Sequence, residues 1–478
     1  MDMTAKKKTC EICIHGHFYQ PPRDDPFTGE IPTDREAGPY KNWNERINAE
    51  CYAPVAEAGH FEEISFNLGS TLACWMDQYD HETYSKIVDA EQAYREAHEV
   101  SNSLAQPVHH TILPLARTRD KICQIRWGIA SFEHRFGHRP EGMWLPEMAV
   151  DYDTLQVLVA EGIRFTILSE EQVHGDLKAG AGPYRVEVPN GGEIAVFVRD
   201  QALSNAISFE MPEAANAQKW LKDQVAQRKD KLSAKDDPPL LLIATDGETF
   251  GHHQEQGVSF LANVLASGAD LGCTLTTLGR YLRDHPPQEN VEIIPNSAWS
   301  CSHGLSRWSI GCDCTPGDSR WKGALRRALD NLACDLDGVY IQEADRMGVN
   351  PWALRDDYVS VVLGRTDGSA FLIDQGLGHL SSHKALRLLT LLESQYHRQR
   401  MYTSCAFFFE DLDRLEPRYA IANGIRALAL TCYATRNDLS HGFRRDLQVA
   451  FSGKNGRTGT DILDEILDRA AAARRRSE

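Results

Sequence analysis

Residues 240–253 read Leu-Leu-Leu-Ile-Ala-Thr-Asp-Gly-Glu-Thr-Phe-Gly-His-His. The apolar run 240–245 has the composition of a strand that is buried on both faces, and such strands belong mainly to parallel sheets. The run ends in two carboxylates, a glycine and two histidines, a dense set of titratable groups. Active sites of α/β proteins lie where parallel strands end. The stretch therefore predicts both a fold class and the place of a site.

Similar short apolar runs alternate with amphipathic stretches from residue 10 to residue 285. The other runs that resemble strands are 11–15, 64–67, 142–145, 163–169 and 193–198. Helices are predicted between them at 84–100, 119–136, 154–161 and 214–228. Strands that alternate with helices indicate a mainly parallel sheet, either open or closed into a barrel.

The alternation stops at residues 285–290, His-Pro-Pro-Gln-Glu-Asn. Beyond this stretch the sequence is mostly helical in composition and spacing, with helices predicted at 321–346, 351–363, 383–399, 418–435 and 462–475. We therefore expect a βα domain at 1–285 and a mainly helical domain at 286–478.

The chain carries 51 Lys and Arg residues against 68 Asp and Glu residues, a net charge of −17. This balance is the opposite of what neutralising nucleic-acid phosphates requires, so we expect no nucleic-acid partner. No apolar run reaches the length of about 18 residues that a membrane span needs, and the start lacks the apolar region of a secretory signal. We expect a cytoplasmic protein whose partner is a neutral or weakly charged small molecule or polysaccharide. The oligomeric state stays unknown.

The 12 cysteines are scattered through the chain, as is usual for reduced thiols of the cytosol. Two spacings could suggest a metal ion, Cys10 with Cys13 and Cys312 with Cys314. Cys10 and Cys13 lie three apart on a predicted strand, where their side chains point to opposite faces. We interpret Cys312 and Cys314 as part of a loop turn. We therefore expect no metal ion and no cofactor.

A second candidate site follows the run 142–145. Residues 142–151 read Gly-Met-Trp-Leu-Pro-Glu-Met-Ala-Val-Asp, so a short strand is followed by the carboxylate of Glu147, where the catalytic loops of a βα barrel lie. Glu147 could equally stand at the N-terminus of a helix, and Asp246 could cap a turn or a helix. Two carboxylates on one face also suit glycosidic cleavage, in which one attacks the anomeric carbon and the other protonates the leaving oxygen, about 5–5.5 Å apart in retaining enzymes.

A third candidate segment ends the first strand. Residues 12–23 read Ile-Cys-Ile-His-Gly-His-Phe-Tyr-Gln-Pro-Pro-Arg. His15, His17 and Gln20 can hydrogen-bond to sugar hydroxyl groups. The histidines could also be metal ligands or buried core residues.

Together the three segments resemble the family 57 glycoside hydrolases. In that family a His-rich first strand, a Trp-x-Pro-Glu strand end and an Asp-x-Glu-x-Phe-Gly-His loop occur in this order. The resemblance implies a (β/α)7-type incomplete TIM barrel with Glu147 as nucleophile and Asp246 as acid/base. It also implies a substrate site that includes His15, His17, Gln20, Trp144, Arg199, Asp200, Glu248 and His252.

Residues 14–23, 43–47, 300–308 and 401–405 resemble a subgroup in which the barrel precedes a helical domain of unknown function, the 3536 type. Members are often longer, so this chain resembles a short form. The resemblance implies a retaining hydrolase or 4-α-glucanotransferase that acts on α-glucans or maltooligosaccharides, without deciding between amylase, branching and transferase activity.

Trp299, His303 and Trp308 surround Gly304 just beyond the predicted boundary. We interpret them as a lid or a sugar-stacking platform that the helical domain contributes to the mouth of the barrel. A structural cluster at a domain interface is the alternative.

Two other functions remain open. The first is a metal-dependent sugar deacetylase with zinc ligands drawn from His15, His17, Asp246 and His252, which would leave Glu147 without a role. The second is a non-catalytic glycan-binding protein that keeps the same fold.

Overall fold

The computed structural model describes residues 10–177, 180–229, 238–267 and 273–477. Residues 1–9, on which the expectation about a secretory signal partly depends, lie outside this part of the chain. The chain divides into two compact units. The first comprises Met1–Gln20, Asp34–Gln106 and Arg135–Pro295, and the second comprises Pro21–Thr33, Pro107–His134 and Asn296–Glu478. The second unit therefore takes two segments from within the predicted βα domain.

The first unit is built on parallel strands that hydrogen bonds join into a ring. Its regular strands are β1 (Cys10–Phe18), β2 (Ser65–Leu68), β3 (Ser103–Leu104), β4 (Phe165–Ser169), β7 (Glu193–Arg199) and β8 (Leu240–Asp246). β1 pairs in parallel with both β2 and β8, β2 pairs with β3, and β4 pairs with β7.

Residues 142–144 lie between β3 and β4 in the order of the strands. Parallel bridges join Met143 to Ala105 and Gly142 to Phe165, although this stretch forms no regular strand. The backbone N–H of Asp200 donates to the carbonyl oxygen of Leu242 at 2.9 Å and closes the ring between β7 and β8. Within the described residues the ring thus runs β8, β1, β2, β3, residues 142–144, β4 and β7, which makes seven segments.

The remaining elements of the first unit surround this ring. The helices are α1 (Trp43–Ile47), α2 (Ala53–Glu57), α3 (Ser70–Tyr79), α4 (His81–His98), α6 (Tyr152–Ala160), α7 (Gln201–Phe209), α8 (Ala217–Lys229), α9 (Gly257–Ala266) and α10 (Leu278–Asp284). Short strands are β5 (Val173–His174), β6 (Tyr184–Glu187), β9 (Cys273–Leu275), β10 (Glu289–Asn290) and β11 (Glu292–Ile293).

Cys10 and Cys273 form a disulfide between β1 and β9, which differs from our expectation that all thiols are reduced. The two residues are paired neighbours in parallel strands, and their Cα atoms lie 4.6 Å apart, within the range that a disulfide can bridge. Cys13 on the same strand is free and buried. Cys10 and Cys13 therefore do not share one site, as expected from their spacing.

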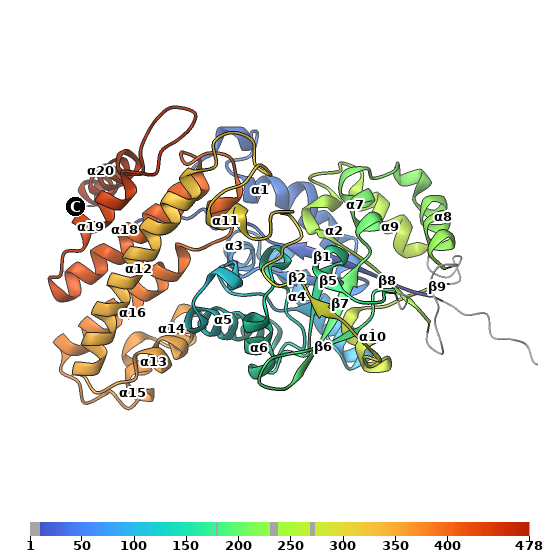
Figure 1. Ribbon diagram of the computed structural model, residues 1–478, viewed down its shortest axis with the longest axis horizontal. Coiled ribbons are helices and arrows are strands. Elements are labelled where there is room, and N and C mark those ends of the chain that lie inside the picture. The colour runs from blue at the N-terminus through green and yellow to red at the C-terminus, as the bar shows by residue number, and fades with distance from the viewer. Residues whose placement is uncertain (1–9, 178–179, 230–237, 268–272, 478) are drawn as a thin grey trace, which may run out of the picture. The chain divides into compact units, whose positions relative to one another are not determined.

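The second unit is a helical assembly. Its elements are α5 (Thr118–Phe136, apart from its last two residues), α11 (Ser306–Ser309), α12 (Trp321–Arg346), α13 (Pro351–Asp357), α14 (Val359–Val362), α15 (Gly368–Asp374), α16 (Ser382–Arg400), α17 (Cys405–Phe408), α18 (Leu415–Thr435), α19 (Ser440–Leu447) and α20 (Gly459–Ser477). Figure 1 shows α12, α16 and α18 as long helices side by side. Trp127 of α5 is part of a buried apolar cluster with Tyr340 and Leu391, so this helix supplies core to the helical unit.

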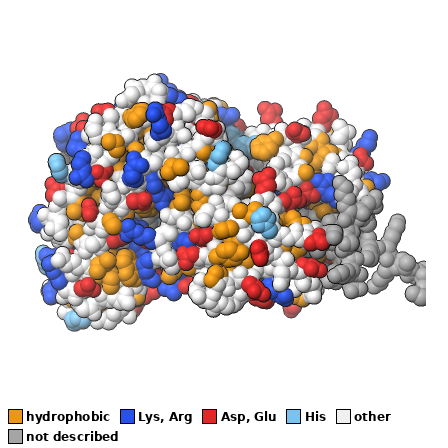
Figure 2. Space-filling view, in the orientation of Figure 1, with side chains coloured by type: hydrophobic (Ala, Val, Ile, Leu, Met, Phe, Trp, Pro, Cys, Tyr) orange, Lys and Arg blue, Asp and Glu red, His pale blue; other side chains and the backbone are white. Residues whose placement is uncertain are grey.

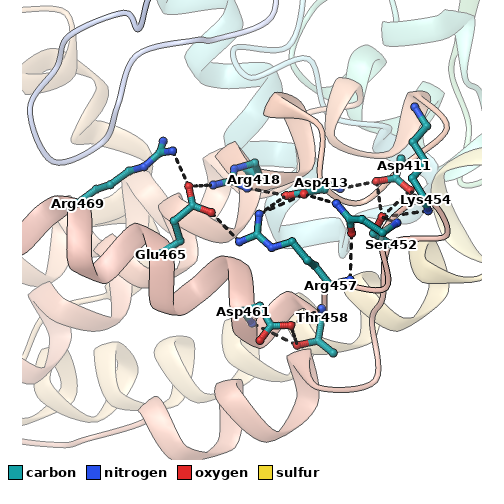
Figure 3. Close-up of polar contacts among 11 residues, drawn as sticks. Asp411, Asp413, Arg418, Ser452, Lys454, Arg457, Thr458, Asp461, Glu465 and Arg469 are labelled. Atoms are coloured by element: carbon teal, nitrogen blue, oxygen red, sulfur yellow. Dashed lines mark hydrogen bonds and ion pairs between the residues drawn. The ribbon is translucent and has the colours of Figure 1, made fainter.

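An ion-pair network fixes the last helix of this unit (Figure 3). Glu465 on α20 accepts from Arg418 on α18 at 2.5 Å and from Arg457 at 2.6 Å. Arg418 also donates to Asp413 at 2.6 Å, and Arg457 reaches the same carboxylate at 3.2 Å. Hydrogen bonds from Arg418 and Arg457 lower the pKa of Glu465 to about 2, so its charge persists at neutral pH.

Figure 2 shows side chains of both charges on the face in view, and in the whole chain Asp and Glu outnumber Lys and Arg, which gives the net charge of −17. None of the helices among the described residues is long and apolar enough to cross a membrane.

Candidate active site

The interior of the barrel mouth is lined by polar groups from β1 and β2. His15 and His17 lie two apart on β1 and therefore point to the same side of the sheet. His15 Nε2 and His17 Nδ1 each lie 3.2 Å from Asn67 Oδ1 on β2. Both rings also stack on Trp144, with ring centroids 5.1 Å and 4.7 Å away. Burial lowers the pKa of His15 to about 3 and that of His17 to about 4, so both imidazoles are neutral at pH 7.

The predicted nucleophile Glu147 stands in a short turn after residues 142–144. The turn is the 3₁₀ segment Pro146–Met148, and Glu147 has φ 57° and ψ 20°. Met148 also has a positive φ of 49°. Left-handed conformations cost free energy for residues other than glycine, and such strain gathers at functional sites. The next helix, α6, begins only at Tyr152 and is capped by Asp151, so Glu147 is not a helix N-terminal carboxylate.

Asp246, the predicted acid/base, is the last residue of β8, and most of its surface is buried. Its side chain makes no capping hydrogen bond to the turn that follows, which argues against the alternative of a helix cap. Burial, together with the negative charges of Glu248 and Glu147, raises the pKa of Asp246 from 3.8 to about 7. The charge of Glu147 therefore contributes to the surroundings of Asp246. β8 and residues 142–144 face each other across the ring, because β4 and β7 separate them on one side and β1, β2 and β3 on the other.

Glu248 is held as an anion beside Asp246. Gln20 Nε2 donates to Glu248 Oε2 at 2.7 Å and to the hydroxyl of Tyr52 at 2.9 Å. His253 Nε2 lies 3.2 Å from Glu248 Oε1. Burial pushes the pKa of Glu248 upward, but the hydrogen bonds from His253 and Gln20 outweigh it and the pKa is lowered overall. Two neighbouring carboxyl groups thus have their pKa values driven apart, and the negative charge of Glu248 favours the protonated form of Asp246.

Arg199 is the last residue of β7 and Asp200 follows it, and the two side chains have different partners. Arg199 is buried, and its guanidinium donates to Ser169 Oγ at 3.2 Å and to the carbonyl oxygen of Ala244 at 3.3 Å. Asp200 caps α7 by accepting from the N–H of Leu203 at 2.8 Å and forms an ion pair with Arg228. These contacts give Asp200 a structural role. Its predicted contact with substrate stays a prediction.

The His252 side chain pairs with the carboxylate of Glu50. Its Nδ1 lies 2.5 Å from Glu50 Oε2, and its ring meets Trp43 edge-on at 5.8 Å. The deacetylase hypothesis needs His252 to converge with His15, His17 and Asp246. Within the described part of the chain these four do not form a group whose ligand atoms lie in mutual range. The geometry therefore gives the deacetylase hypothesis no support.

The predicted platform residues Trp299, His303 and Trp308 lie in the second unit. Trp308 is 0% exposed, and its ring centroid lies 6.4 Å from that of Phe408. A sugar cannot stack on a ring with no exposed face, so Trp308 fits the alternative of a structural cluster. His303 is exposed, with Nδ1 3.2 Å from Cys314 Sγ. Trp299 is half-buried, and its sugar-stacking role stays a prediction.

Several side chains of the site were not predicted. Asn67 joins the two histidines and also donates from Nδ2 to Gln106 Oε1 at 2.8 Å. Tyr52 and His253 complete the surroundings of Gln20 and Glu248. The signal for Asn67 was available, because Ser65 and Asn67 are polar residues at alternate positions of a short strand. Tyr52 and Gln106 lie in stretches without a strand pattern and become neighbours only through the tertiary fold.

Comparison with protein families assigns both halves of the chain. Residues 34–293 match the model of glycosyl hydrolase family 57, and residues 318–474 match a domain of unknown function, DUF3536. Among characterised proteins, alpha-amylase 1 of Dictyoglomus thermophilum is 26% identical over 199 residues, which cover 39% of this chain and 26% of that enzyme. A probable 1,4-alpha-glucan branching enzyme of Mycobacterium tuberculosis is 25% identical over 252 residues, covering 43% of this chain and 47% of that protein. The matched stretch thus spans about a quarter of the first relative and about half of the second.

Solved structures share the fold at low sequence identity. An exo-type maltose-forming amylase of Pyrococcus sp. ST04 has a TM-score of 0.75 at 16% identity, with 96% of this chain and 89% of that chain covered. A branching enzyme of Pyrococcus horikoshii has a TM-score of 0.60 at 15% identity, with 97% and 95% covered. The expected (β/α)7 barrel followed by a helical region is confirmed. Since residues 34–293 make up more than half of the chain and contain both Glu147 and Asp246, the chain belongs to glycosyl hydrolase family 57.

Proposed function

We propose that the chain is a retaining enzyme that cleaves or transfers α-glucosidic bonds of α-glucans or maltooligosaccharides, with Glu147 as nucleophile and Asp246 as general acid/base. The observation that carries the proposal is the placement of Asp246 at the end of β8 and of Glu147 after residues 142–144, across the ring of strands. Burial and the charges of Glu248 and Glu147 raise the pKa of Asp246 to about 7. A carboxyl group that keeps its proton near neutral pH can donate it to a leaving oxygen, and an unperturbed aspartate cannot.

In the first step, a Glu147 oxygen attacks the anomeric carbon while the glycosidic C–O bond breaks. Asp246 transfers its proton to the departing oxygen, so the aglycone leaves as an alcohol and a covalent glycosyl ester forms on Glu147. Esterification removes the negative charge of Glu147, which contributes to the raised pKa of Asp246. The pKa of Asp246 therefore falls at this point, and its carboxylate becomes the base for the second step.

In the second step, Asp246 removes a proton from an incoming hydroxyl group, whose oxygen attacks the anomeric carbon and breaks the ester. Water gives hydrolysis, and a sugar hydroxyl gives transfer. Two displacements at one carbon retain its configuration, and Glu147 and protonated Asp246 are regenerated. The chemistry is the same in both cases, so the acceptor alone decides between the two activities.

The rest of the site supports binding of a neutral substrate. His15 and His17 are uncharged at pH 7, and Asn67, Gln20 and Glu248 supply further polar groups. The relatives named above act, by their names, as amylase and branching enzyme, which supports an α-glucan as substrate class.

Incubation with maltoheptaose followed by chromatography of the products tests the proposal, with Glu147→Gln as the matched inactive control. Hydrolysis gives only shorter oligosaccharides, and transfer gives products both longer and shorter than the starting material. Binding of maltooligosaccharides with no turnover over a range of pH and temperature would replace the proposal with the glycan-binding hypothesis. Release of acetate from acetylated sugars, lost on chelation, would replace it with the deacetylase hypothesis.

A further inference from the structure

Three cysteines and one histidine converge in the loops that precede α12. Cys301, His303, Cys312 and Cys314 each offer one ligand atom, and these four atoms all lie within 4.8 Å of one another. Cys301 Sγ lies 3.6 Å from Cys312 Sγ and 3.9 Å from Cys314 Sγ, and His303 Nδ1 lies 3.2 Å from Cys314 Sγ. All four residues belong to the helical unit, and none has a part in the chemistry proposed for Glu147 and Asp246.

The spacing of the sulfur atoms matches a shared metal ion. In a tetrahedral site with Zn–S bonds of about 2.3 Å, two thiolate sulfurs lie about 3.8 Å apart, and a thiolate sulfur lies about 3.6 Å from an imidazole nitrogen. A disulfide would need about 2.05 Å between two sulfurs. The distances of 3.6 Å and 3.9 Å therefore agree with ligands around one ion better than with an oxidised pair.

The backbone holds these ligands in two tight loops. Gly304 follows His303 with φ 67°, and a Cβ atom there would lie 2.6 Å from the carbonyl oxygen of Asn296. Gly311 precedes Cys312 with φ 89°, and a Cβ atom there would lie 2.4 Å from the carbonyl oxygen of Ser319. Both positions require glycine. Other residues rarely adopt a positive φ, and their Cβ atom would clash with a backbone oxygen. The chain is thus bent sharply next to a ligand in each loop.

The surroundings suit a site with excess negative charge. Three thiolates and one zinc ion carry a net charge of −1. Arg307 donates from Nη2 to the carbonyl oxygen of Cys314 at 3.3 Å, and its guanidinium lies over the ring of Phe408 at 4.4 Å. Lys322 Nζ donates to Thr315 Oγ1 at 3.1 Å. Two cationic side chains are therefore fixed beside the cluster.

We infer that Cys301, His303, Cys312 and Cys314 form a structural zinc site of the Cys3His type. Thiolate and imidazole ligands favour zinc over magnesium and calcium, which prefer oxygen ligands. Four protein ligands leave no open position for a substrate or a water, so the ion stabilises structure and does no chemistry. The ion links Cys301 and His303 to Cys312 and Cys314, and so it stabilises the loops between Ala298 and Thr315 that precede α12. This inference differs from our interpretation of Cys312 and Cys314 as a loop turn and from our expectation of no metal ion.

Metal analysis of the full chain tests the inference. We expect one zinc ion per chain in protein that is purified with reductant and dialysed against metal-free buffer. Cys312→Ser with Cys314→Ser should lose the ion, whereas Cys74→Ser, which removes an exposed thiol elsewhere, should keep it. His252→Gln should also keep it, and loss of zinc in that variant would place the ion in the barrel and overturn the inference.

A second measurement works on the unmodified chain, in case the double variant does not fold. Zinc added to metal-free protein should protect three thiols from a thiol-specific reagent under native conditions, and cobalt should give the visible absorption of a tetrahedral site with thiolate ligands. Protein that binds neither zinc nor cobalt would overturn the inference. So would a disulfide between Cys301 and either Cys312 or Cys314, found by mass spectrometry of unreduced peptides from reductant-purified protein.

Discussion

His17 on β1 and Asp246 on β8 are register partners in neighbouring parallel strands. Asn67 on β2 occupies the matching position on the other side of His17. Burial lowers the pKa of His17 to about 4, so the imidazole beside Asp246 is uncharged at pH 7. A neutral neighbour does not lower the pKa of Asp246, whereas a protonated histidine there would. This placement lets Asp246 retain the proton that a general acid needs.

The charge of Glu248 should set the alkaline limit of activity. Its negative charge contributes, after burial, to the raised pKa of Asp246. Glu248→Gln removes that charge, so the pKa of Asp246 falls and the acid loses its proton at lower pH. We expect the alkaline limb of kcat/KM against pH to move toward acid.

The matched control is Glu193→Gln, an exposed carboxylate at the start of β7, which should leave the profile unchanged. The acidic and alkaline limbs of the pH profile report apparent pKa values of the coupled carboxyl groups together, and not of single residues. A Glu248→Gln profile that coincides with the wild-type profile would refute the electrostatic role of Glu248.

Asp246 should also lower stability at neutral pH. Its pKa is raised from 3.8 to about 7 on folding, so between these values the folded chain binds more protons than the unfolded chain. The free energy of unfolding contributed by this group therefore falls as pH rises through that window. Asp246→Asn removes the titration. The gain in unfolding free energy of the variant over wild type should grow from pH 4 to pH 7 and then level off.

Urea unfolding at a series of pH values measures this difference. Glu193→Gln again serves as the control and should show no such rise. A difference between Asp246→Asn and wild type that is constant with pH would mean that the pKa of Asp246 is not raised in the folded chain.

The sequence predicted where most barrel strands lie. It did not predict which segments belong to which of the two units. β1, β7 and β8 lie where the apolar runs predict them, and α12 has the predicted bounds of residues 321 to 346. α5 was predicted as a helix, but its assignment to the helical unit depends on Trp127 packing against Tyr396 and other distant residues. Local periodicity contains no information about such a partner.

The candidate site shows the same limit. Glu147 and Asp246 could be located because each follows an apolar run and because the motifs resemble a known family. The four residues of the zinc cluster could not be grouped, since Cys301 and Cys312 are brought together by glycine turns whose direction the sequence pattern does not indicate. Trp308 matched the composition of a sugar platform, yet it is fully buried near Phe408, a residue that is distant in the sequence.

Glu147→Gln should abolish turnover of maltooligosaccharides while the chain stays folded. Gln is nearly isosteric with Glu, so the turn at φ 57° can persist, but an amide is a poor nucleophile. We expect kcat to fall by at least about 10³-fold, as for other residues that carry a covalent step. Circular dichroism and the unfolding midpoint provide the control for folding. A purified variant with more than about a tenth of the wild-type rate would exclude Glu147 as nucleophile.

Arg398 should be critical for the stability of the helical unit. The guanidinium is 2% exposed and donates to Asp120 and Asp337, at 2.7 Å each. Arg398→Leu leaves two buried carboxylates short of a partner, which should lower the free energy of unfolding by about 3–5 kcal/mol. Arg444→Leu breaks the exposed pair with Asp464 and should cost at most about 1 kcal/mol. Urea unfolding of both variants measures the difference, and equal effects would contradict the role of burial.

The acid/base role of Asp246 can be separated from a binding role by the choice of leaving group. Fluoride leaves without a proton, whereas the oxygen of an unactivated maltooligosaccharide needs one. In Asp246→Ala the first step with an α-glucosyl fluoride should therefore survive, while cleavage of maltooligosaccharides should fall by at least about 10²-fold. The second step lacks its base in this variant, so the glycosyl ester on Glu147 should accumulate.

Azide is an anion that attacks the ester without a base, and its addition should restore turnover of the fluoride. One displacement by Glu147 inverts the anomeric carbon and a second by azide inverts it again, so a retaining enzyme with both steps intact gives the α-glycosyl azide. The space left by Asp246→Ala lies on the leaving-group face, from which azide reaches only the ester. Direct displacement of fluoride would need azide on the opposite face, where Glu147 stands, and would give the β-glycosyl azide by a single inversion. Glu147→Ala with Asp246→Ala is the control, since it opens the face where Glu147 stands and should form the β product but not the α product. Equal losses on both substrates, with no azide product of either configuration, would remove Asp246 from the acid/base role.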